Sequence, residues 1–329
     1  MSTCNMSLLP FNFAPSQTWI QVVLLVVGIV AVVKSAGWLT DGSVGIATRM
    51  GVPQIVIGLT VVAMGTSMPE FFVSLMSALG GKPGLAVGNI VGSNIFNATL
   101  IVGVAALVAP ITILPDTVKR DIPFALVASV VLLMLCLDGN ISRVDAAILF
   151  VLFLVFMYLT LQEAKKGMKE EKDPLDQPIN LSVGKSSLLI VIGLVGLIVG
   201  SEVFVDNASA LAHTLGVSDA VIGLTIVACG TSLPELATST VAASRGNSGI
   251  AIGNVLGSNV FNILMILGVT GIISPMNTQG ITNADLSVMV ISMILLWLFS
   301  YTKYRIERWE GVALTALFIG YIAYLLYQV

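Results

Sequence analysis

Two pairs of nearly identical segments recur in this sequence at one fixed offset. IGLTVVAMGTSMPE (57–70) aligns with IGLTIVACGTSLPE (222–235), 165 residues further on. AVGNIVGSNIFN (86–97) aligns with AIGNVLGSNVFN (251–262) at the same offset. Two blocks in one register are not a coincidence, so the chain consists of two homologous halves and the fold of one half constrains the fold of the other.

Each half contains five long apolar segments. The chain of 329 residues is 56% hydrophobic and 10% charged, whereas soluble domains carry roughly 25% charged residues. Apolar runs of about 20 residues fit membrane-spanning helices, because the strands of a membrane barrel alternate over about 10 residues. We therefore predict an all-α membrane protein of ten transmembrane helices, with approximate centres at Val27, Gly65, Ser93, Val130, Leu152, Ile198, Gly230, Gly257, Met293 and Phe318.

The odd number of spans per half sets the topology. The second half must enter the membrane from the side opposite to the first, which makes an inverted repeat of the kind found in secondary transporters. Inverted repeats also build some channels, so this architecture alone does not decide the function. The predicted segments are an extracellular N-terminal stretch (1–17), the first repeat (18–162), a cytoplasmic linker (163–184) and the second repeat (185–329).

The distribution of positive charge predicts the orientation. With the N-terminus outside, twelve of the fifteen Lys and Arg fall on the cytoplasmic side. Only Lys82 and Arg143 fall outside, and Lys34 lies within the first span. The positive-inside rule thus favours a multi-pass protein of the cell membrane with both termini extracellular.

The motif GTS(M/L)PE places a proline and a carboxylate near the middle of a predicted span. Proline removes one hydrogen bond of the helical ladder, so Pro69 and Pro234 interrupt spans two and seven. The freed carbonyls cannot face lipid and must line an enclosed or wet cavity. A carboxylate at this depth costs at least about 2.5–3.5 kcal/mol and usually marks an ion pathway. Carbonyl, hydroxyl and carboxylate oxygens together suit hard cations, namely Ca²⁺, Na⁺, Mg²⁺ or Mn²⁺.

A purely structural interpretation of the same motif stays open. Ser67 with Glu70, and Ser232 with Glu235, also fit a capping box with proline in the first turn of a restarting helix. We expect capping to contribute to the restart of each helix. It does not explain a glutamate at bilayer depth, since Gln caps as well, so ion binding is the preferred interpretation.

The second repeated block is small and rich in amides. Its GxxxG pairs predict close helix contact. Asn97 and Asn262 stand at symmetric positions, where an amide oxygen can ligate a cation or hold a glutamate, and Ser93 and Ser258 are weaker candidates for the same role. The other asparagines of the block are interpreted as packing or helix-breaking amides.

GTSMPE with GNIVGSNIFN, and GTSLPE with GNVLGSNVFN, resemble the two α-repeats of the sodium/calcium exchanger family, and the likeness extends over both halves. The resemblance implies a Ca²⁺/Na⁺ antiporter that works by alternating access, with helices 2, 3, 7 and 8 broken at a central site. The family's ligands correspond to the following residues of this chain: Glu70, Glu235, Ala63, Thr66, Ser67, Ala228, Thr231, Ser232, Ser93, Asn97, Ser258 and Asn262. Several family members carry an aspartate in one of the two positions held here by Asn97 and Asn262, so coupling to Na⁺ is an open question.

Several alternatives remain at this stage. Two glutamates match one Ca²⁺ or at least two Na⁺, but protons or another divalent cation could take part, and a cation channel is a further possibility. An enzyme is disfavoured, because no HExxH pair is present and no histidine-based triad can form around one histidine. We expect Ca²⁺ and Na⁺ as transported substrates, the lipid bilayer as surroundings, and no cofactor, nucleic acid or obligate protein partner. Lys34 is expected either to pair with Asp41 or to extend towards the membrane surface.

Overall fold

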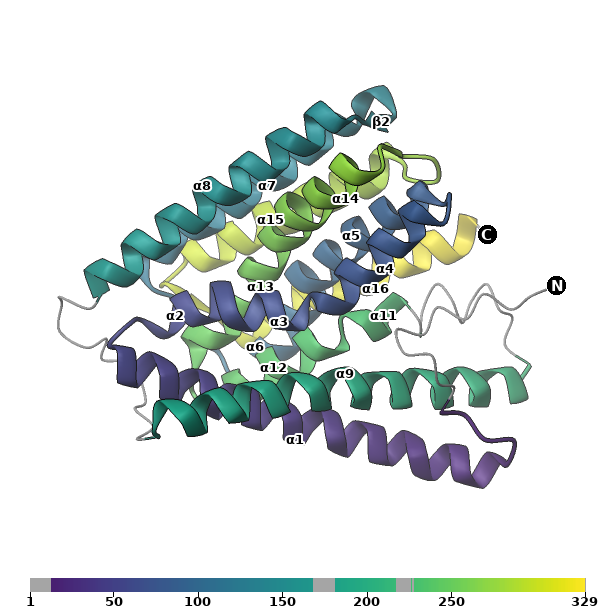
Figure 1. Cartoon of the computed structure of the whole chain (residues 1–329), viewed down its shortest axis with the longest axis horizontal. Helices are drawn as coiled ribbons and strands as arrows, with labels where there is room; N and C mark the ends of the chain where they lie inside the picture. Colours follow the sequence, from purple (N-terminus) through teal and green to yellow (C-terminus); the bar gives the residue numbers. More distant parts are fainter. Residues whose placement is uncertain (1–12, 168–180, 217–225, 227, 329) are drawn as a thin grey trace.

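The computed structural model is almost entirely helical (Figure 1) and describes residues 13–167, 181–216, 226 and 228–328. Within these residues, eight helices are long and apolar enough to cross a membrane, and one further bent pair forms a ninth span. The remaining predicted span, centred on Gly230, has its first part in residues 217–225 and 227, outside the described residues, and its second part is helical.

The elements of the two halves follow the same order. The first half contains α1 (Thr18–Met50), α2 (Gln54–Ile57), η1 (Gly58–Val62), α3 (Ala63–Thr66), α4 (Met68–Leu79), α5 (Pro83–Phe96), η2 (Asn97–Ile101), α6 (Val102–Val108), β1 (Ile111–Thr112), η3 (Thr117–Asp121), α7 (Ile122–Leu135), η4 (Cys136–Asp138), β2 (Asn140–Ile141) and α8 (Arg143–Gly167). The second half contains α9 (Val183–Thr214), α11 (Ala228–Thr231), α12 (Leu233–Ser244), α13 (Ser248–Val260), η6 (Phe261–Ile266), α14 (Leu267–Ile273), β3 (Met276–Asn277), α15 (Asn283–Tyr301), β4 (Arg305–Ile306) and α16 (Arg308–Gln328).

Spans three and eight differ from the prediction that they are broken. Residues Pro83–Val108 and Ser248–Ile273 each form one continuous apolar helix. Each contains a π-helical turn, η2 or η6, which takes up an extra residue without interrupting the helix. No proline lies inside either helix to remove a hydrogen bond, so the backbone widens at these turns instead of breaking.

Helices α1 and α9 lie side by side along one edge of the molecule (Figure 1). Their backbones come close together: a Cβ atom added to Gly193 of α9 would lie 2.7 Å from the backbone nitrogen of Leu39 of α1. At 33 and 32 residues, each helix is about 50 Å long. The other helices form a second body that packs against this pair.

Two short strand pairs join the halves at opposite ends of the molecule. β1 of the first half pairs with β4 of the second, and β2 of the first half pairs with β3 of the second, both antiparallel. The β1–β4 pair lies towards the end where residues 167 and 181 flank the linker, here called the linker side. The other lies towards the opposite end, where α4 and α5 meet, here called the far side (Figure 1).

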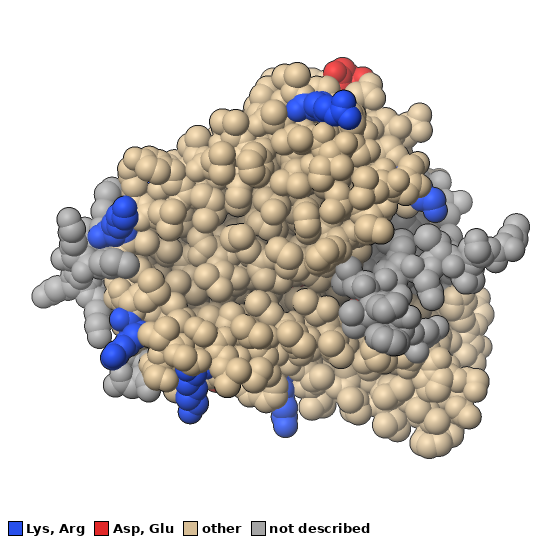
Figure 2. Space-filling model, viewed as in Figure 1, with Lys and Arg blue, Asp and Glu red and all other residues tan. Residues whose placement is uncertain are grey.

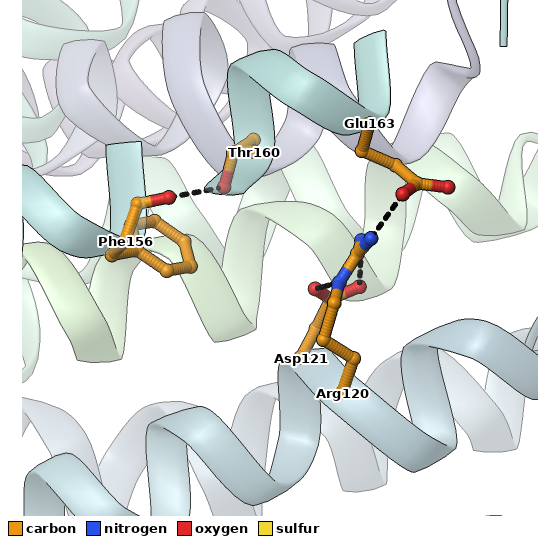
Figure 3. Close-up of polar contacts among 5 residues, drawn as sticks. All are labelled: Arg120, Asp121, Phe156, Thr160 and Glu163. Carbon is orange, nitrogen blue, oxygen red and sulfur yellow. Dashed lines mark hydrogen bonds and ion pairs between the residues drawn. The ribbon is translucent and has the colours of Figure 1, made fainter. Parts of the chain in front are cut away.

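The linker side also carries an ion-pair cluster shown in Figure 3. Arg120 of η3 donates to both carboxylate oxygens of Asp121, at 2.9 and 3.3 Å, and pairs with Glu163 near the end of α8. In α8 itself, the Thr160 hydroxyl donates to the Phe156 carbonyl one turn earlier. The cluster therefore ties the start of span four to the end of span five.

The molecular surface is that of a membrane protein. In the space-filling view of Figure 2 the middle of the face is uncharged, and the few charged side chains lie around its periphery. Large apolar side chains are exposed along the outer helices, for example Val26 and Val30 on α1 and Val191 and Val195 on α9. Such a surface is stable next to hydrocarbon but not next to water.

Candidate functional site

Two interrupted spans meet at the centre of the molecule. In the first half, α3 ends at Thr66 and α4 starts at Met68, and the helices on either side of this break are bent by 46°. In the second half, Ser232 separates α11 from α12 in the same way. Each proline lies in the first turn of the restarting helix, where its missing N–H is tolerated. The structure therefore breaks spans two and seven at the repeated motif, as the sequence predicts.

The two glutamates of the motif are fully buried and are bound across the repeat. Glu70 is in the first turn of α4 and Glu235 in the first turn of α12, both with no exposed surface. The Ser67 hydroxyl donates to Glu235 Oε1 at 2.9 Å, and the Ser232 hydroxyl donates to Glu70 Oε1 at 2.9 Å. Each serine thus binds the carboxylate of the other half.

This arrangement corrects the capping-box interpretation. Neither Ser67 nor Ser232 makes a side-chain cap on its own helix. Ser67 has φ −84° and ψ 8°, and Ser232 has φ −89° and ψ 7°. A capping serine needs an extended backbone to turn its hydroxyl back to its own helix. Here each serine hydroxyl instead donates a hydrogen bond to the glutamate of the opposite half.

The second repeated block completes the cluster. The Ser93 and Ser232 hydroxyl oxygens lie 3.0 Å apart, and the Asn262 amide nitrogen donates to the Ser93 hydroxyl at 3.2 Å. A second bond runs from the same nitrogen to Asn94 Oδ1 at 3.3 Å. The amide of Asn262 is therefore oriented with its nitrogen bound and its oxygen free.

Six oxygen atoms of the predicted ligands are buried and have no hydrogen-bond partner among the described residues. They are Glu70 Oε2, Glu235 Oε2, Asn97 Oδ1, Asn262 Oδ1, Ser258 Oγ and Thr231 Oγ1. An unpaired buried polar atom costs about 1–3 kcal/mol, and more if it is charged. Carboxylate, amide and hydroxyl oxygens with free lone pairs are the ligands of a hard cation, so the donor set fits Ca²⁺ or Na⁺. Within the described residues there is no group of three or more His, Cys, Asp or Glu, so two carboxylates and neutral oxygens form the cluster.

The remaining predicted ligands come from the last turns before the breaks. The Thr66 hydroxyl donates to Asn254 Oδ1 at 3.0 Å and approaches the Ala63 carbonyl oxygen at 3.3 Å. That carbonyl also accepts the Ser67 backbone N–H at 3.0 Å, so it is already engaged in the helix. On the other half, Thr231 Oγ1 is buried and no described residue bonds to it, while the backbone of Ala228 begins α11.

Two asparagines classed as packing amides in the sequence hold the glutamate backbones. Asn89 donates to the Glu70 carbonyl at 3.3 Å, and Asn254 donates to the Glu235 carbonyl at 3.3 Å. A signal for them was available, because they occur in both copies of the block with the same offset. Their second acceptors, at 3.0 Å in both halves, are Ser74 and Ser239, which also lie 165 residues apart.

The two sides of the site are packed differently. On the linker side, a Cβ atom added to Gly257 of α13 would lie 2.6 Å from the Leu59 carbonyl oxygen and 2.7 Å from Ala63 Cβ. On the far side, the counterparts of Leu59 and Ala63 are residues 224 and 228, whose side chains lie outside the described residues. Asn254 is fully buried, whereas its mate Asn89 is partly exposed. At this asparagine the repeated motif is therefore more deeply buried on the linker side than on the far side.

Comparison with known proteins identifies the family. A family model described as "Sodium/calcium exchanger protein" matches residues 20–162 and 185–327. The chain belongs to the sodium/calcium exchanger family. It is 37% identical over 310 residues to "Inner membrane protein YrbG" of Escherichia coli, covering 92% of this chain and 95% of that protein. It is 32% identical over 342 residues to "Sodium/calcium exchanger MaX1" of Methanosarcina acetivorans, covering 92% of this chain and 98% of that one.

A solved structure agrees with this assignment. The structure of the sodium-calcium exchanger NCX_Mj soaked with 2.5 mM Na⁺ and 0.1 mM Ca²⁺ matches this exchanger-family chain with a TM-score of 0.81 at 36% identity. The match covers 92% of this chain and 98% of that chain. The prediction of a helical, multi-pass exchanger-family protein is therefore confirmed.

One of the two arrangements expected for Lys34, an ion pair with Asp41, differs from the structure of this exchanger-family chain. Asp41 pairs with Arg245 at the end of α12, at 2.6 Å, and not with Lys34. Arg245 also donates to the Gly37 carbonyl at 3.0 Å. Lys34 is exposed on the outer face of α1, four residues from exposed Trp38. Lys34 and Asp41 are almost two helical turns, about 10 Å, apart along α1, and the Asp41 carboxylate is bound by Arg245 instead.

Three other polar residues of α9 differ in their exposure and contacts. Asp206, the repeat mate of Asp41, accepts the backbone N–H of Phe13 at 2.9 Å. Glu202 is buried with 7% of its surface exposed, and His213 is exposed in the last turn of α9. Cys229 is partly buried in α11 and packs against the apolar core.

Proposed function

We propose that this protein exchanges Ca²⁺ against Na⁺ across the membrane by alternating access at the central cluster. The observation that carries the proposal is the pair of fully buried glutamates, one from each half, each bound by a serine of the other half and each keeping one unpaired carboxylate oxygen. The proposed ligands are Glu70, Glu235, Ala63, Thr66, Ser67, Ala228, Thr231, Ser232, Ser93, Asn97, Ser258 and Asn262.

Charge balance favours exchange over one-way leakage. Two ionised glutamates place a charge of −2 in a buried cluster, which one Ca²⁺ or two Na⁺ neutralise. Closing low-dielectric protein around an uncompensated pair of charges is strongly unfavourable. Each passage of the cluster from one side to the other therefore requires a cation load, and loading by different cations in the two directions is antiport.

Membership of an exchanger family makes the protein a transporter, and we propose no enzymatic activity, no cofactor and no obligate protein partner. Ca²⁺ and Na⁺ are transported substrates. For the orientation, we propose both termini outside the cell membrane and the linker in the cytoplasm, with segment boundaries at 1–17, 18–162, 163–184 and 185–329. Exchange of a divalent cation against H⁺ is the alternative, but no contact at the cluster favours it over Na⁺.

The test is ⁴⁵Ca²⁺ flux into proteoliposomes under an imposed Na⁺ or H⁺ gradient. We expect uptake driven by the Na⁺ gradient and abolished by Glu70→Gln and by Glu235→Gln, with the folded yield unchanged. Glu310→Gln is the matched control, since Glu310 is buried but accepts bonds from the Thr302 hydroxyl and the Glu307 backbone outside the cluster. Uptake that needs neither gradient would refute antiport. Normal uptake by either site variant would make the glutamates structural.

A further inference from the structure

Asn254 connects candidate ligands of the two halves. Its amide nitrogen donates to the Glu235 carbonyl at 3.3 Å and to the Ser239 hydroxyl at 3.0 Å, both on α12. Its amide oxygen accepts the Thr66 hydroxyl of α3 at 3.0 Å. The residue is fully buried on α13. One side chain thereby joins the helix that ends at the first break to the helix that starts at the second.

Asn89, the repeat mate, makes two of the same three bonds. Its nitrogen donates to the Glu70 carbonyl at 3.3 Å and to the Ser74 hydroxyl at 3.0 Å, the same distances as in the other half. The third bond would come from Thr231, the mate of Thr66. Thr231 Oγ1 is buried and bonds to no described residue. The difference between the halves at this point is therefore a single hydrogen bond.

This difference follows the packing of the two sides. The Thr66–Asn254 bond is present on the linker side, where α13 is tightly packed against η1 and α3 at Gly257. The Thr231–Asn89 bond is missing on the far side, where Asn89 is partly exposed. In an inverted repeat, reversing the open and closed sides exchanges the conformations of the two halves. The missing bond then forms as the existing one breaks.

We infer that Asn254 and Asn89 are positioning residues that act in alternation: Asn254 holds Thr66 while the linker side is closed, and Asn89 holds Thr231 while the far side is closed. The inference rests on the alternating access proposed above. A threonine that donates its only hydroxyl proton to an asparagine keeps its oxygen lone pairs free for a cation. Released from Asn254, the Thr66 hydroxyl has the Ala63 carbonyl at 3.3 Å as its other acceptor.

Four variants in two matched pairs test the inference. Asn254→Ala and Asn89→Ala remove the amides and leave the proposed ligands in place, whereas Thr66→Val and Thr231→Val remove the alternating bond together with a ligand hydroxyl while keeping the shape of the side chain. The valine pair keeps the test usable where an alanine variant fails to fold. If Asn254 and Asn89 were packing residues only, all four changes would affect stability without favouring one side.

The readout is the rate at which single cysteines react with a charged methanethiosulfonate reagent, for purified protein in lipid nanodiscs at fixed Na⁺ and Ca²⁺. Native Cys229 reports on the far side, once Cys4 and Cys136 are replaced by serine. Met64→Cys, its repeat mate, reports on the linker side in a background that also lacks Cys229. Both positions flank the central break and are partly buried.

We expect Asn254→Ala and Thr66→Val to raise the rate at position 64 and lower it at Cys229, by about three- to tenfold, the worth of one buried hydrogen bond. Asn89→Ala and Thr231→Val should not shift the rates in that direction. The inference is overturned if the first pair leaves both rates unchanged, or if all four variants shift them in the same direction. Flux of the unmutated protein is measured separately, so loss of Na⁺-driven uptake refutes the proposed function, whereas normal uptake with no change in labelling refutes only this inference.

Discussion

Replacing Gly257 by alanine tests whether the linker side is as tightly closed as the packing indicates. The added Cβ would lie 2.6 Å from the Leu59 carbonyl oxygen and 2.7 Å from both Leu59 Cα and Ala63 Cβ. Ordinary contact begins at 3.4 Å, so α13 has to move by about 0.8 Å away from η1 and α3. Forcing a well-packed contact apart costs typically about 1–3 kcal/mol. Because the atoms it meets are backbone or Cβ atoms that cannot rotate away, we expect the upper part of that range.

The assay is thermal unfolding of the purified protein in detergent, followed by tryptophan fluorescence. We expect Gly257→Ala to lower the Tm by several degrees, because about 1 kcal/mol shifts the Tm by a few degrees in domains of 150–250 residues. Gly320→Ala is the control, since Gly320 is exposed on α16, no described atom lies within 4 Å of its added Cβ, and alanine is favoured over glycine in a helix. Equal Tm values for the two variants would refute the tight packing at Gly257.

Gly92→Ala, at the repeat mate of Gly257, tests closure of the far side. If the far side closes against α5 during exchange, Gly92→Ala slows Na⁺-driven Ca²⁺ uptake. Unchanged uptake in Gly92→Ala would mean that the far side closes without close packing at this glycine. That outcome would leave the stability result for Gly257→Ala intact.

Three further outcomes are expected. Arg120→Gln should lower the free energy of unfolding by about 1–3 kcal/mol, because Asp121, with 4% of its side chain exposed, loses its partner. Adding Asp121→Asn should recover part of the loss. No recovery in thermal unfolding would argue against the ion pair as the cause. Asn97→Asp should alter the dependence of ⁴⁵Ca²⁺ uptake on Na⁺ and pH without lowering the folded yield. The reason is that the Asn97 amide is fully buried with both polar atoms unpaired among the described residues. Identical Na⁺ and pH profiles would contradict a ligand role. Asp41→Asn should change the free energy of unfolding by less than about 1 kcal/mol, because both side chains of the Asp41–Arg245 pair are more than one-third exposed and solvent screens them. A larger loss of Tm that persists at high salt would show that the pair is more buried than in this structure.

The break in each interrupted span could be predicted from local sequence. A proline removes a backbone donor wherever it stands in a helix, so Pro69 and Pro234 mark their breaks without reference to the rest of the chain. The breaks expected in spans three and eight came from the family resemblance and were wrong, because these spans have no internal proline and take up an extra residue in a π-helical turn. Whether a helix widens or breaks there depends on the neighbours that pack around it.

The sequence by itself determined that two homologous halves, each with an odd number of apolar spans, bring one glutamate apiece to mid-membrane depth, because span length, proline position and repeat offset are properties of the chain alone. Only the tertiary structure decided that Ser67 binds Glu235 and Ser232 binds Glu70, since those partners are more than 160 residues apart and meet through the packing of the halves. Tertiary packing also decided that two nearly identical motifs differ, with Asn254 buried and Asn89 partly exposed. An inverted repeat can close on either side, and in the conformation described here the linker side is closed.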